Sequence, residues 1–262
     1  CCGQGMHKHC TADLKSMNMD GSCPLCRAKT PNTDEETINQ LRPWVKKKRA
    51  WALAMMGQMY KYGKGVKQSF EMAKRLYELA AQQGDVTSMV GLGEIYFKGQ
   101  GVEQSYEKAV EYYKLGAQQG YAEAMFNLGG MYYNGQCVEQ SYEKAKEYYE
   151  QAAHLGYADA HINLGVLYEK GIGVTRSYTK ARELYELAAD QNSPSALGKL
   201  GSLYANGFGV QQDLTKAREL FNKAVAQGSK NAVGCLQWID SEEIRLAALD
   251  PNAIVCSFCG LP

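Results

Sequence analysis

The sequence predicts an all-α protein, an α/α superhelical solenoid of five 36-residue repeats with a small cysteine-rich module at its N-terminus. Three observations lead to this prediction. Tyrosine, glycine and alanine recur with a strict 36-residue step between residues 49 and 228. The residues between them keep helical spacing, and most cysteines lie at the two ends. The 262 residues therefore divide into segments of 48, 180 and 34 residues.

The repeat is visible in several series that keep the same step. The tyrosines are Tyr60, Tyr96, Tyr132, Tyr168 and Tyr204, and a glycine lies three residues before and three residues after each one. Val66 and Ala73 begin two further series, and no insertion or deletion interrupts any of them. An internal repeat of this length predicts stacked supersecondary units, each of which buries its apolar face against its neighbours.

Each repeat contains the pattern of two helices. Ala124, Leu128 and Tyr132 follow each other at intervals of four, which places them on one face of a first helix. Ala145 and Tyr149 have the same relation in a second helix. The joint between the two carries a Gly-x-Gly turn such as 171–173, where glycine permits positive φ.

Helix ends have recognisable residues in every copy. The expected N-cap residues of the second helices are Ser69, Ser105, Ser141, Ser177 and Asp213. The expected left-handed residues after the second helices are Gly84, Gly120, Gly156 and Gly228, with Asn192 in the fourth copy. Ser193 and Pro194 then predict an N-cap and a proline in the first helical position.

Two of these features have a functional alternative. The tyrosine series would suit a ligand-binding ladder, but its helical spacing in five copies favours a place in the core. The Gly-x-Gly pairs resemble a phosphate-binding loop, but they follow a helix and lack the third glycine, which favours a turn.

The elements Leu-Gly-x-x-Tyr, Gly-x-Gly-Val, Lys-Ala and Ala-Ala-x-x-Gly at this period resemble Sel-1-like repeats, relatives of the 34-residue tetratricopeptide repeat. The resemblance covers about two thirds of the chain. It implies an α/α superhelix whose curved surface binds other proteins, usually as an adaptor. Two positions depart from the pattern: Cys137 replaces a joint glycine, and Met56 replaces a leucine.

Composition excludes several other classes of protein. The chain has 29 basic and 28 acidic residues, so no broad basic field for nucleic acid is expected. No apolar run approaches the roughly 18 residues that would cross a membrane. We find no nucleophile–base pair or nucleotide loop, and no catalytic residue is predicted. His154 and His161 are expected to be a surface pair.

The terminal cysteines indicate zinc. Cys23 with Cys26 and Cys256 with Cys259 form Cys-x-x-Cys pairs, whose two thiolates can meet one tetrahedral Zn²⁺. The two cysteines inside the array, at 137 and 235, are expected to be ordinary core or turn residues.

The N-terminal pattern resembles the second half of a RING finger. The matching residues are Cys2, His7, Cys10, Cys23 and Cys26. The resemblance implies that Cys2, Cys23 and Cys26 share one zinc ion, while His7 and Cys10 share another with two upstream cysteines. Those upstream ligands are absent, so the sequence is expected to be a fragment. Gln4 stands at a ligand position, for which Cys1 or His9 would substitute.

RING fingers recruit a ubiquitin-conjugating enzyme. By resemblance, Pro24 and Leu25 match the loop that contacts this enzyme, and Arg27 matches the arginine that bridges it to ubiquitin. The alternative for Arg27 is a merely solvated position. At the other end, Cys256 and Cys259 resemble the opening of a MYND-type finger, a protein-binding module.

The expected domains are a partial RING-type zinc module, a linker with a lead-in helix, the repeats, a capping helix region and the start of a MYND-like finger. Their ranges are 1–30, 31–48, 49–228, 229–250 and 251–262. Within the linker, 28–37 is polar, and Ile38, Leu41 and Val45 then have helical spacing. The basic run 46–49 would suit a nuclear localisation signal, but a solvated helix face is favoured. A cytoplasmic or nuclear protein is expected.

Two functional hypotheses follow. The favoured one is a zinc-binding scaffold that holds client or partner proteins on the repeat surface, with no nucleic acid or membrane as partner. The alternative, which applies when the RING is complete, is a RING-type E3 ubiquitin ligase that selects substrates with the repeats and recruits a ubiquitin-conjugating enzyme.

Overall fold

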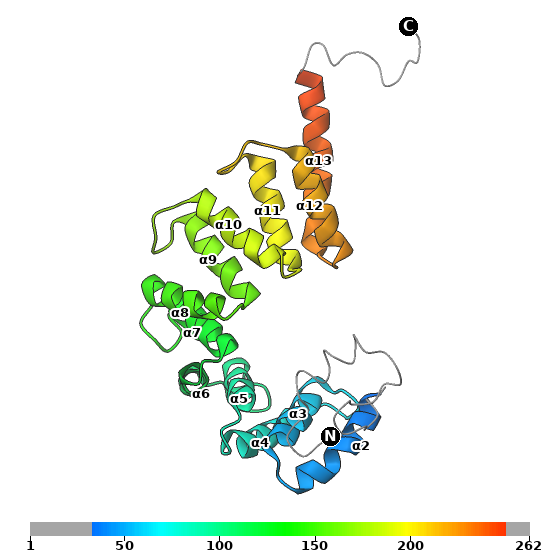
Figure 1. Cartoon of the computed structure of the whole chain (residues 1–262), viewed down its shortest axis with the longest axis vertical. Helices are drawn as coiled ribbons and strands as arrows, with labels where there is room; N and C mark the ends of the chain where they lie inside the picture. Colours follow the sequence, from blue (N-terminus) through cyan, green and yellow to red (C-terminus); the bar gives the residue numbers. More distant parts are fainter. Residues whose placement is uncertain (1–32, 250–262) are drawn as a thin grey trace. The chain divides into compact units, whose positions relative to one another are not determined.

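The computed structural model describes residues 33–249, and these residues lie in helices or in the short segments that join them, with no strand among them (Figure 1). The helices are α2 (Asp34–Lys46), α3 (Ala50–Tyr62), α4 (Phe70–Ala81), α5 (Val86–Lys98), α6 (Tyr106–Gln118), α7 (Ala122–Asn134), α8 (Tyr142–His154), α9 (Ala158–Lys170), α10 (Tyr178–Ala189), α11 (Pro194–Asn206), α12 (Leu214–Ala226) and α13 (Lys230–Leu249). The all-α prediction is therefore confirmed for the described part of the chain.

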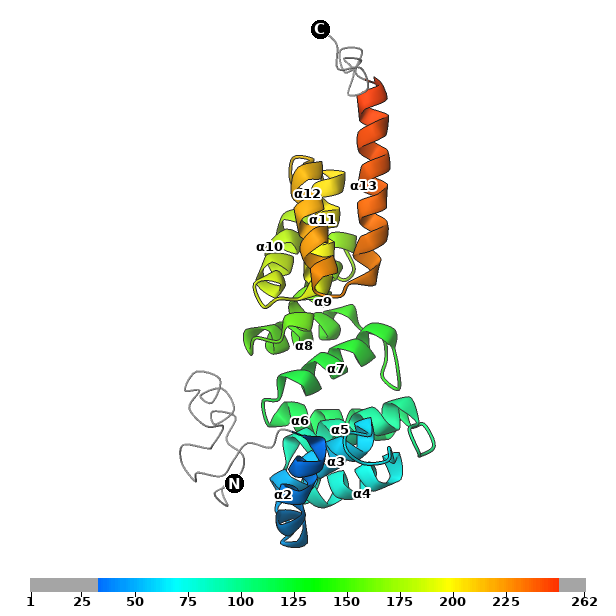
Figure 2. The ribbon, with the colours of Figure 1, turned by 90° about the vertical axis from the view of Figure 1, so that its right-hand side faces the viewer.

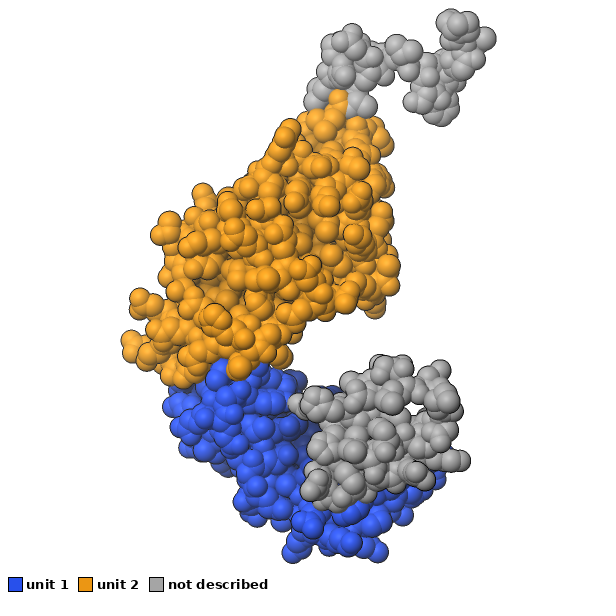
Figure 3. Space-filling model, in the orientation of Figure 1, with its two compact units in different colours: residues 1–131, 136–138 blue, residues 132–135, 139–262 orange. Residues whose placement is uncertain are grey.

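The chain forms two compact units (Figure 3). Unit 1 comprises residues 1–131 and 136–138, and unit 2 comprises residues 132–135 and 139–262. In unit 1, α3 packs against α4, α5 packs against α6, and α4 also contacts α5. In unit 2, each helix from α8 to α12 packs against the next one along the chain. Figure 2 shows these helix pairs from the side. The helix–turn–helix repeat predicted from the sequence is thus present in both units.

The predicted caps of the second helices are confirmed. The Ser69 hydroxyl accepts a hydrogen bond from the backbone N–H of Met72 at 3.2 Å, which satisfies one of the free donors at the start of α4. Ser105, Ser141, Ser177 and Asp213 make the same contact at the starts of α6, α8, α10 and α12. The left-handed residues after these helices are also as predicted, with φ of 85° at Gly84 and 60° at Asn192.

Two predicted turn residues behave differently from their equivalents. Ser193 occupies the N-cap position of α11, but its side chain makes no capping hydrogen bond; Pro194 at the first helical position is as predicted. Cys137 takes the positive φ of the joint glycine that it replaces, at 57°, and is exposed. Cys235 is half-buried and packs against the apolar core of unit 2.

The core is built on contacts between a glycine of the first helix and an aromatic ring of the second. A Cβ placed on Gly57 would lie 2.7 Å from Cε1 of Tyr77, and Tyr77 is only 3% exposed. The same relation joins Gly93 to Tyr113, Gly165 to Tyr185 and Gly201 to Phe221. The glycine series found in the sequence therefore exists because the ring occupies the space of a side chain, which lets the two helices approach closely.

The tyrosine series predicted to form the core lies at its edge. Tyr96 is buried, whereas Tyr60, Tyr132, Tyr168 and Tyr204 are half-buried. The Lys108 ammonium lies 4.9 Å from the centre of the Tyr96 ring, and lysines cover Tyr132 and Tyr168 in the same way. The lysines thus cover the outer faces of these rings with cation–π contacts at the edge of the apolar core.

Helices outside the repeats cover the two ends. α2 begins at Asp34, inside the segment expected to be a polar link, because the Thr33 hydroxyl accepts from the Glu36 N–H at 3.1 Å. Ile38 and Leu41 on α2 are buried against α3, as the lead-in pattern predicted. The basic run 46–49 is exposed, and it forms the end of α2 and the turn into α3.

α13 covers the open face of α12. Its residues Ala232 and Ile239 are buried in the core of unit 2, and the Arg218 guanidinium on α12 pairs with Asp240 at 2.6 Å. Among the described residues, none of the helices has the length and hydropathy needed to cross a bilayer.

Candidate functional site: a pocket on the first helices of unit 1

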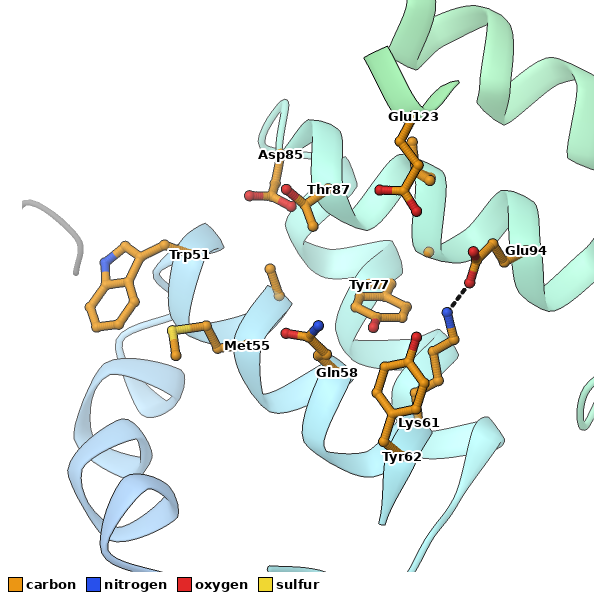
Figure 4. A pocket seen from close by; sticks show the side chains of 13 residues that line it. Trp51, Met55, Gln58, Lys61, Tyr62, Tyr77, Asp85, Thr87, Glu94 and Glu123 are labelled. Carbon is orange, nitrogen blue, oxygen red and sulfur yellow. Dashed lines mark hydrogen bonds and ion pairs between the residues drawn. The ribbon is translucent and has the colours of Figure 1, made fainter. Parts of the chain in front are cut away.

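A pocket of about 270 Å³ opens on the face of unit 1 that is formed by the first helices of the repeats (Figure 4). α3 and α5 form its two walls, the start of α7 closes one end, and the ring of Tyr77 from α4 forms part of its floor. We call it the first-helix pocket. All residues that line it belong to unit 1.

The lining residues occupy equivalent positions in successive repeats. Trp51, Thr87 and Glu123 are 36 residues apart, so one repeat position supplies all three. Gln58 and Glu94 form a second pair of this kind. These positions change in chemistry from copy to copy, while the alanines, glycines and aromatic rings that pack the helices keep their identity. The array thus presents different side chains on a constant frame.

An ion pair joins the two walls of the pocket. The Lys61 ammonium is bonded to the Glu94 carboxylate, which joins α3 to α5, and only 7% of the Lys61 side chain is exposed. The ammonium also lies 5.1 Å from the centre of the Tyr62 ring. A buried charge needs a partner of opposite charge, and Glu94 is that partner for Lys61. Lys61 therefore contributes little positive potential to the rest of the pocket.

Two further carboxylates face the pocket. Asp85 caps α5 by accepting a hydrogen bond from the Ser88 N–H at 2.7 Å. Glu123 is half-buried at the start of α7, and burial, with repulsion from Glu94 as a smaller cause, raises the pKa of its carboxyl above the usual value. The pocket therefore holds three acidic groups against one basic group.

The rest of the α3 wall is apolar and aromatic. Trp51 and Met55 on α3 are half-buried, and the Tyr62 ring is 54% exposed. Gly91 on α5 lies opposite, and a Cβ there would be 2.8 Å from the Tyr77 ring, so the pocket floor has no room for a larger side chain at this position. Burial raises the pKa of the Tyr77 phenol, so this group stays uncharged. A ligand here would meet apolar surface on one side and carboxylates on the other.

The pockets of unit 2 have a different origin. Two grooves, of about 400 and 580 Å³, lie along the second helices and are lined by equivalent residues one repeat apart, such as Tyr168 and Tyr204 or Lys180 and Lys216. They therefore follow from the packing of each repeat. His154 and His161, expected as a surface pair, both line the first of these grooves; His154 is exposed and His161 half-buried.

The structure does not describe the site residues predicted from the sequence. The zinc ligands Cys2, His7, Cys10, Cys23, Cys26, Cys256 and Cys259 and the enzyme-contacting residues Pro24, Leu25 and Arg27 all lie outside the described residues. Within residues 33–249, no cluster of three or more potential metal ligands occurs. The sequence does contain a signal for the pocket. The repeat position of Trp51 holds a different residue in successive copies, whereas packing positions around it keep the same residue.

The fold and the pocket together define a class of protein, the α-helical repeat proteins of the tetratricopeptide type, which present side chains from stacked helix pairs. More specifically, the chain belongs to the Sel1 repeat family. The family model for the Sel1 repeat matches residues 52–85, 86–121, 122–157, 158–193 and 194–229. The five repeats form an all-helical solenoid, as the sequence predicted.

Solved structures support this assignment. A Sel1 repeat protein from Oxalobacter formigenes is 27% identical, with a TM-score of 0.68, over 76% of this chain and 86% of that protein. The protein c5321, a protective antigen of uropathogenic Escherichia coli, is 30% identical with a TM-score of 0.64, and the match covers 79% of this chain but only 44% of that protein.

A third structure shares the fold alone. The immunity protein Pa5087 from Pseudomonas aeruginosa is 18% identical, with a TM-score of 0.57, over 84% of this chain and 83% of that protein. No significant match was found among curated proteins.

Proposed function

We propose that this Sel1 repeat protein is a protein–protein interaction scaffold that binds a segment of a partner protein in the first-helix pocket. The observation that carries the proposal is the exchange of lining residues at constant repeat positions, as in Trp51, Thr87 and Glu123. A frame that keeps its packing residues and varies its exposed ones is suited to recognition, since the surface changes without loss of the core.

The chemistry of the pocket also fits a peptide better than a reaction. Two of its charged groups, Lys61 and Glu94, are paired with each other, and Asp85 caps a helix. Trp51, Met55 and Tyr62 supply the aromatic and apolar surface that anchors a partner side chain.

Display of a random peptide library against the full chain tests this function. We expect enriched peptides that bind the wild type and lose at least about tenfold in affinity with the Met55→Ala/Tyr62→Ala double variant. Leu115→Ala is the control, because Leu115 is 45% exposed on the second helix α6 and does not line the pocket. Enriched peptides that bind the double variant and the wild type equally would refute the proposal.

We also propose that the terminal cysteines bind zinc, an extension that rests on the sequence pattern alone. The Cys23 and Cys26 pair has the spacing of a zinc knuckle. Metal analysis of the full chain is expected to find about one to two zinc ions per molecule, with a loss on Cys23→Ser. Metal-free wild-type protein purified without chelator would contradict it.

A ubiquitin ligase activity is the corresponding second candidate, favoured by the Cys-Pro-Leu-Cys motif followed by Arg27. A zinc-loaded protein in which the RING is complete would then stimulate ubiquitin discharge from a conjugating enzyme, and Arg27→Ala would reduce this stimulation. Unchanged discharge in the presence of such a protein would rule the ligase out and leave the scaffold function intact.

A further inference from the structure

The charges that line the first-helix pocket indicate the chemical class of its ligand. Of its four charged groups, Lys61 and Glu94 neutralise each other. Asp85 and Glu123 remain, and neither forms an ion pair with a residue in 33–249. The pocket thus has an uncompensated charge of about −2 beside an apolar wall, and a complementary ligand brings positive charge.

The position of Glu123 strengthens this inference. Figure 4 shows its carboxylate directed into the space between α3 and α5, on the same side as Asp85 and Thr87. Burial disfavours the ionised form of this carboxyl, and the positive charge of Lys61 and a hydrogen bond from the Tyr121 hydroxyl offset the penalty only in part. A cation bound beside Glu123 would remove the penalty, since an opposite charge at close range favours ionisation.

The apolar wall suits the rest of such a ligand. Tyr62 presents an exposed ring, and the Lys61 ammonium beside it shows that a cation is accommodated at its face. Trp51 and Met55 lie farther along α3 and can take a neighbouring apolar side chain. With a volume of about 270 Å³, the pocket holds one or two side chains rather than a folded element.

We propose that the first-helix pocket binds an extended segment of a partner protein through an arginine side chain, held by Glu123 with Asp85 and placed against the Tyr62 ring. An apolar side chain next to this arginine packs against Trp51 and Met55. Arginine is favoured over lysine because its planar fork can bond a carboxylate with two parallel hydrogen bonds while it stacks on an aromatic face. The inference rests on the proposed peptide-binding function and specifies its ligand.

A peptide array tests the inference with the full chain. The array holds pairs of peptides with identical flanking residues, which differ only in a central arginine or its uncharged analogue citrulline. We expect the arginine member of bound pairs to bind about tenfold more tightly or better, and the difference to shrink at high salt. Glu123→Gln should remove most of the preference and leave the citrulline peptides unchanged.

Asp159→Asn is the matched control. Asp159 occupies the position of Glu123 one repeat later, is exposed, and lies in unit 2, so its loss should leave the arginine preference intact. Thermal unfolding of each variant shows that the fold is retained.

The outcomes separate the two proposals. If arginine and citrulline peptides bind equally and Met55→Ala/Tyr62→Ala abolishes both, the arginine inference is wrong while the peptide-binding function stands. If Glu123→Gln and Asp159→Asn reduce the preference equally, the arginine is held elsewhere and the inference is also wrong. If Met55→Ala/Tyr62→Ala leaves all binding unchanged, both proposals fail.

Discussion

Gly201 of α11 lies directly beneath the ring of Phe221 of α12, so that a Cβ on Gly201 would be 2.7 Å from Cε1 of the ring. Gly198 lies on the same helix, one turn earlier, and a Cβ there would meet nothing within 4 Å. The two glycines have the same secondary structure and opposite surroundings, which makes them a matched pair for testing how the repeats pack.

We expect Gly201→Ala to lower the free energy of unfolding by about 1–3 kcal/mol, because the added methyl group forces Phe221, which is 2% exposed, to move within a packed core. Gly198→Ala should raise it by up to about 1 kcal/mol, since alanine is the better helix former. Urea unfolding measures both. Equal effects of the two substitutions would show that the ring does not require glycine at position 201.

The hydroxyl of Ser88 provides a second test. Ser88 is fully buried, and its Oγ has no hydrogen-bond partner. The equivalent residues in the other repeats are alanines, which have no hydroxyl group: Ala52, Ala124, Ala160 and Ala196. Ser88→Ala should therefore stabilise the protein by about 1 kcal/mol, as measured by urea unfolding.

Ser202→Ala is the control for Ser88→Ala. The Ser202 hydroxyl donates a hydrogen bond to the Gly198 carbonyl at 3.0 Å, so its removal should give no comparable gain. A destabilising Ser88→Ala would mean that the hydroxyl has a partner after all.

The ion pair between Lys61 and Glu94 joins the first two repeats. Lys61→Met leaves the Glu94 carboxylate, whose side chain is 21% exposed, without its partner, and is expected to destabilise the protein by about 2 kcal/mol or more. Lys61→Met combined with Glu94→Gln should recover most of this loss because no charge then remains unpaired. A double-mutant cycle by chemical unfolding gives the coupling, and additive effects would contradict the pairing.

Glu123 predicts a pH dependence of stability. Burial holds the pKa of its carboxyl in the folded protein above the ordinary value of 4.5. The folded state therefore binds the proton more tightly than the unfolded state. The free energy of unfolding falls as the pH rises from the ordinary pKa of the carboxyl to its higher pKa in the folded protein. Glu123→Gln removes that contribution, so the variant should gain stability relative to wild type at about pH 7, and the gain should shrink below about pH 4.5.

Urea unfolding of both proteins across this pH range measures the difference. The matched control is again Asp159→Asn, at the equivalent and exposed position in unit 2. A gain for Glu123→Gln that does not change with pH would show that ionisation of Glu123 is not its cause.

Much of the local structure was predictable because its causes lie within a few residues. Ser69 caps α4 through a backbone group three residues away, and Asn192 ends its repeat through its own backbone conformation. The start of α2 was not predicted. Thr33 caps this helix by a local hydrogen bond, but the polar residues that follow it have the composition of a linker.

Burial was less predictable than helix position. The tyrosine series that begins at Tyr60 and the one that begins at Tyr77 both have helical spacing, yet the second forms the core and the first lies at its edge. Spacing identifies a face of a helix, but the depth of that face depends on which neighbouring helices cover it.

The sequence by itself determined the family, the five repeats, their helices and their turns, because these depend on residue identity at a fixed step and on short-range hydrogen bonds. Only the tertiary structure showed that Gly57 and its equivalents pack against an aromatic ring that leaves no room for a Cβ. It also brought Trp51 and Glu123, 72 residues apart, to one pocket. The stacking of helices converts equal positions in separate repeats into neighbours, and that proximity decides which side chains can meet one ligand.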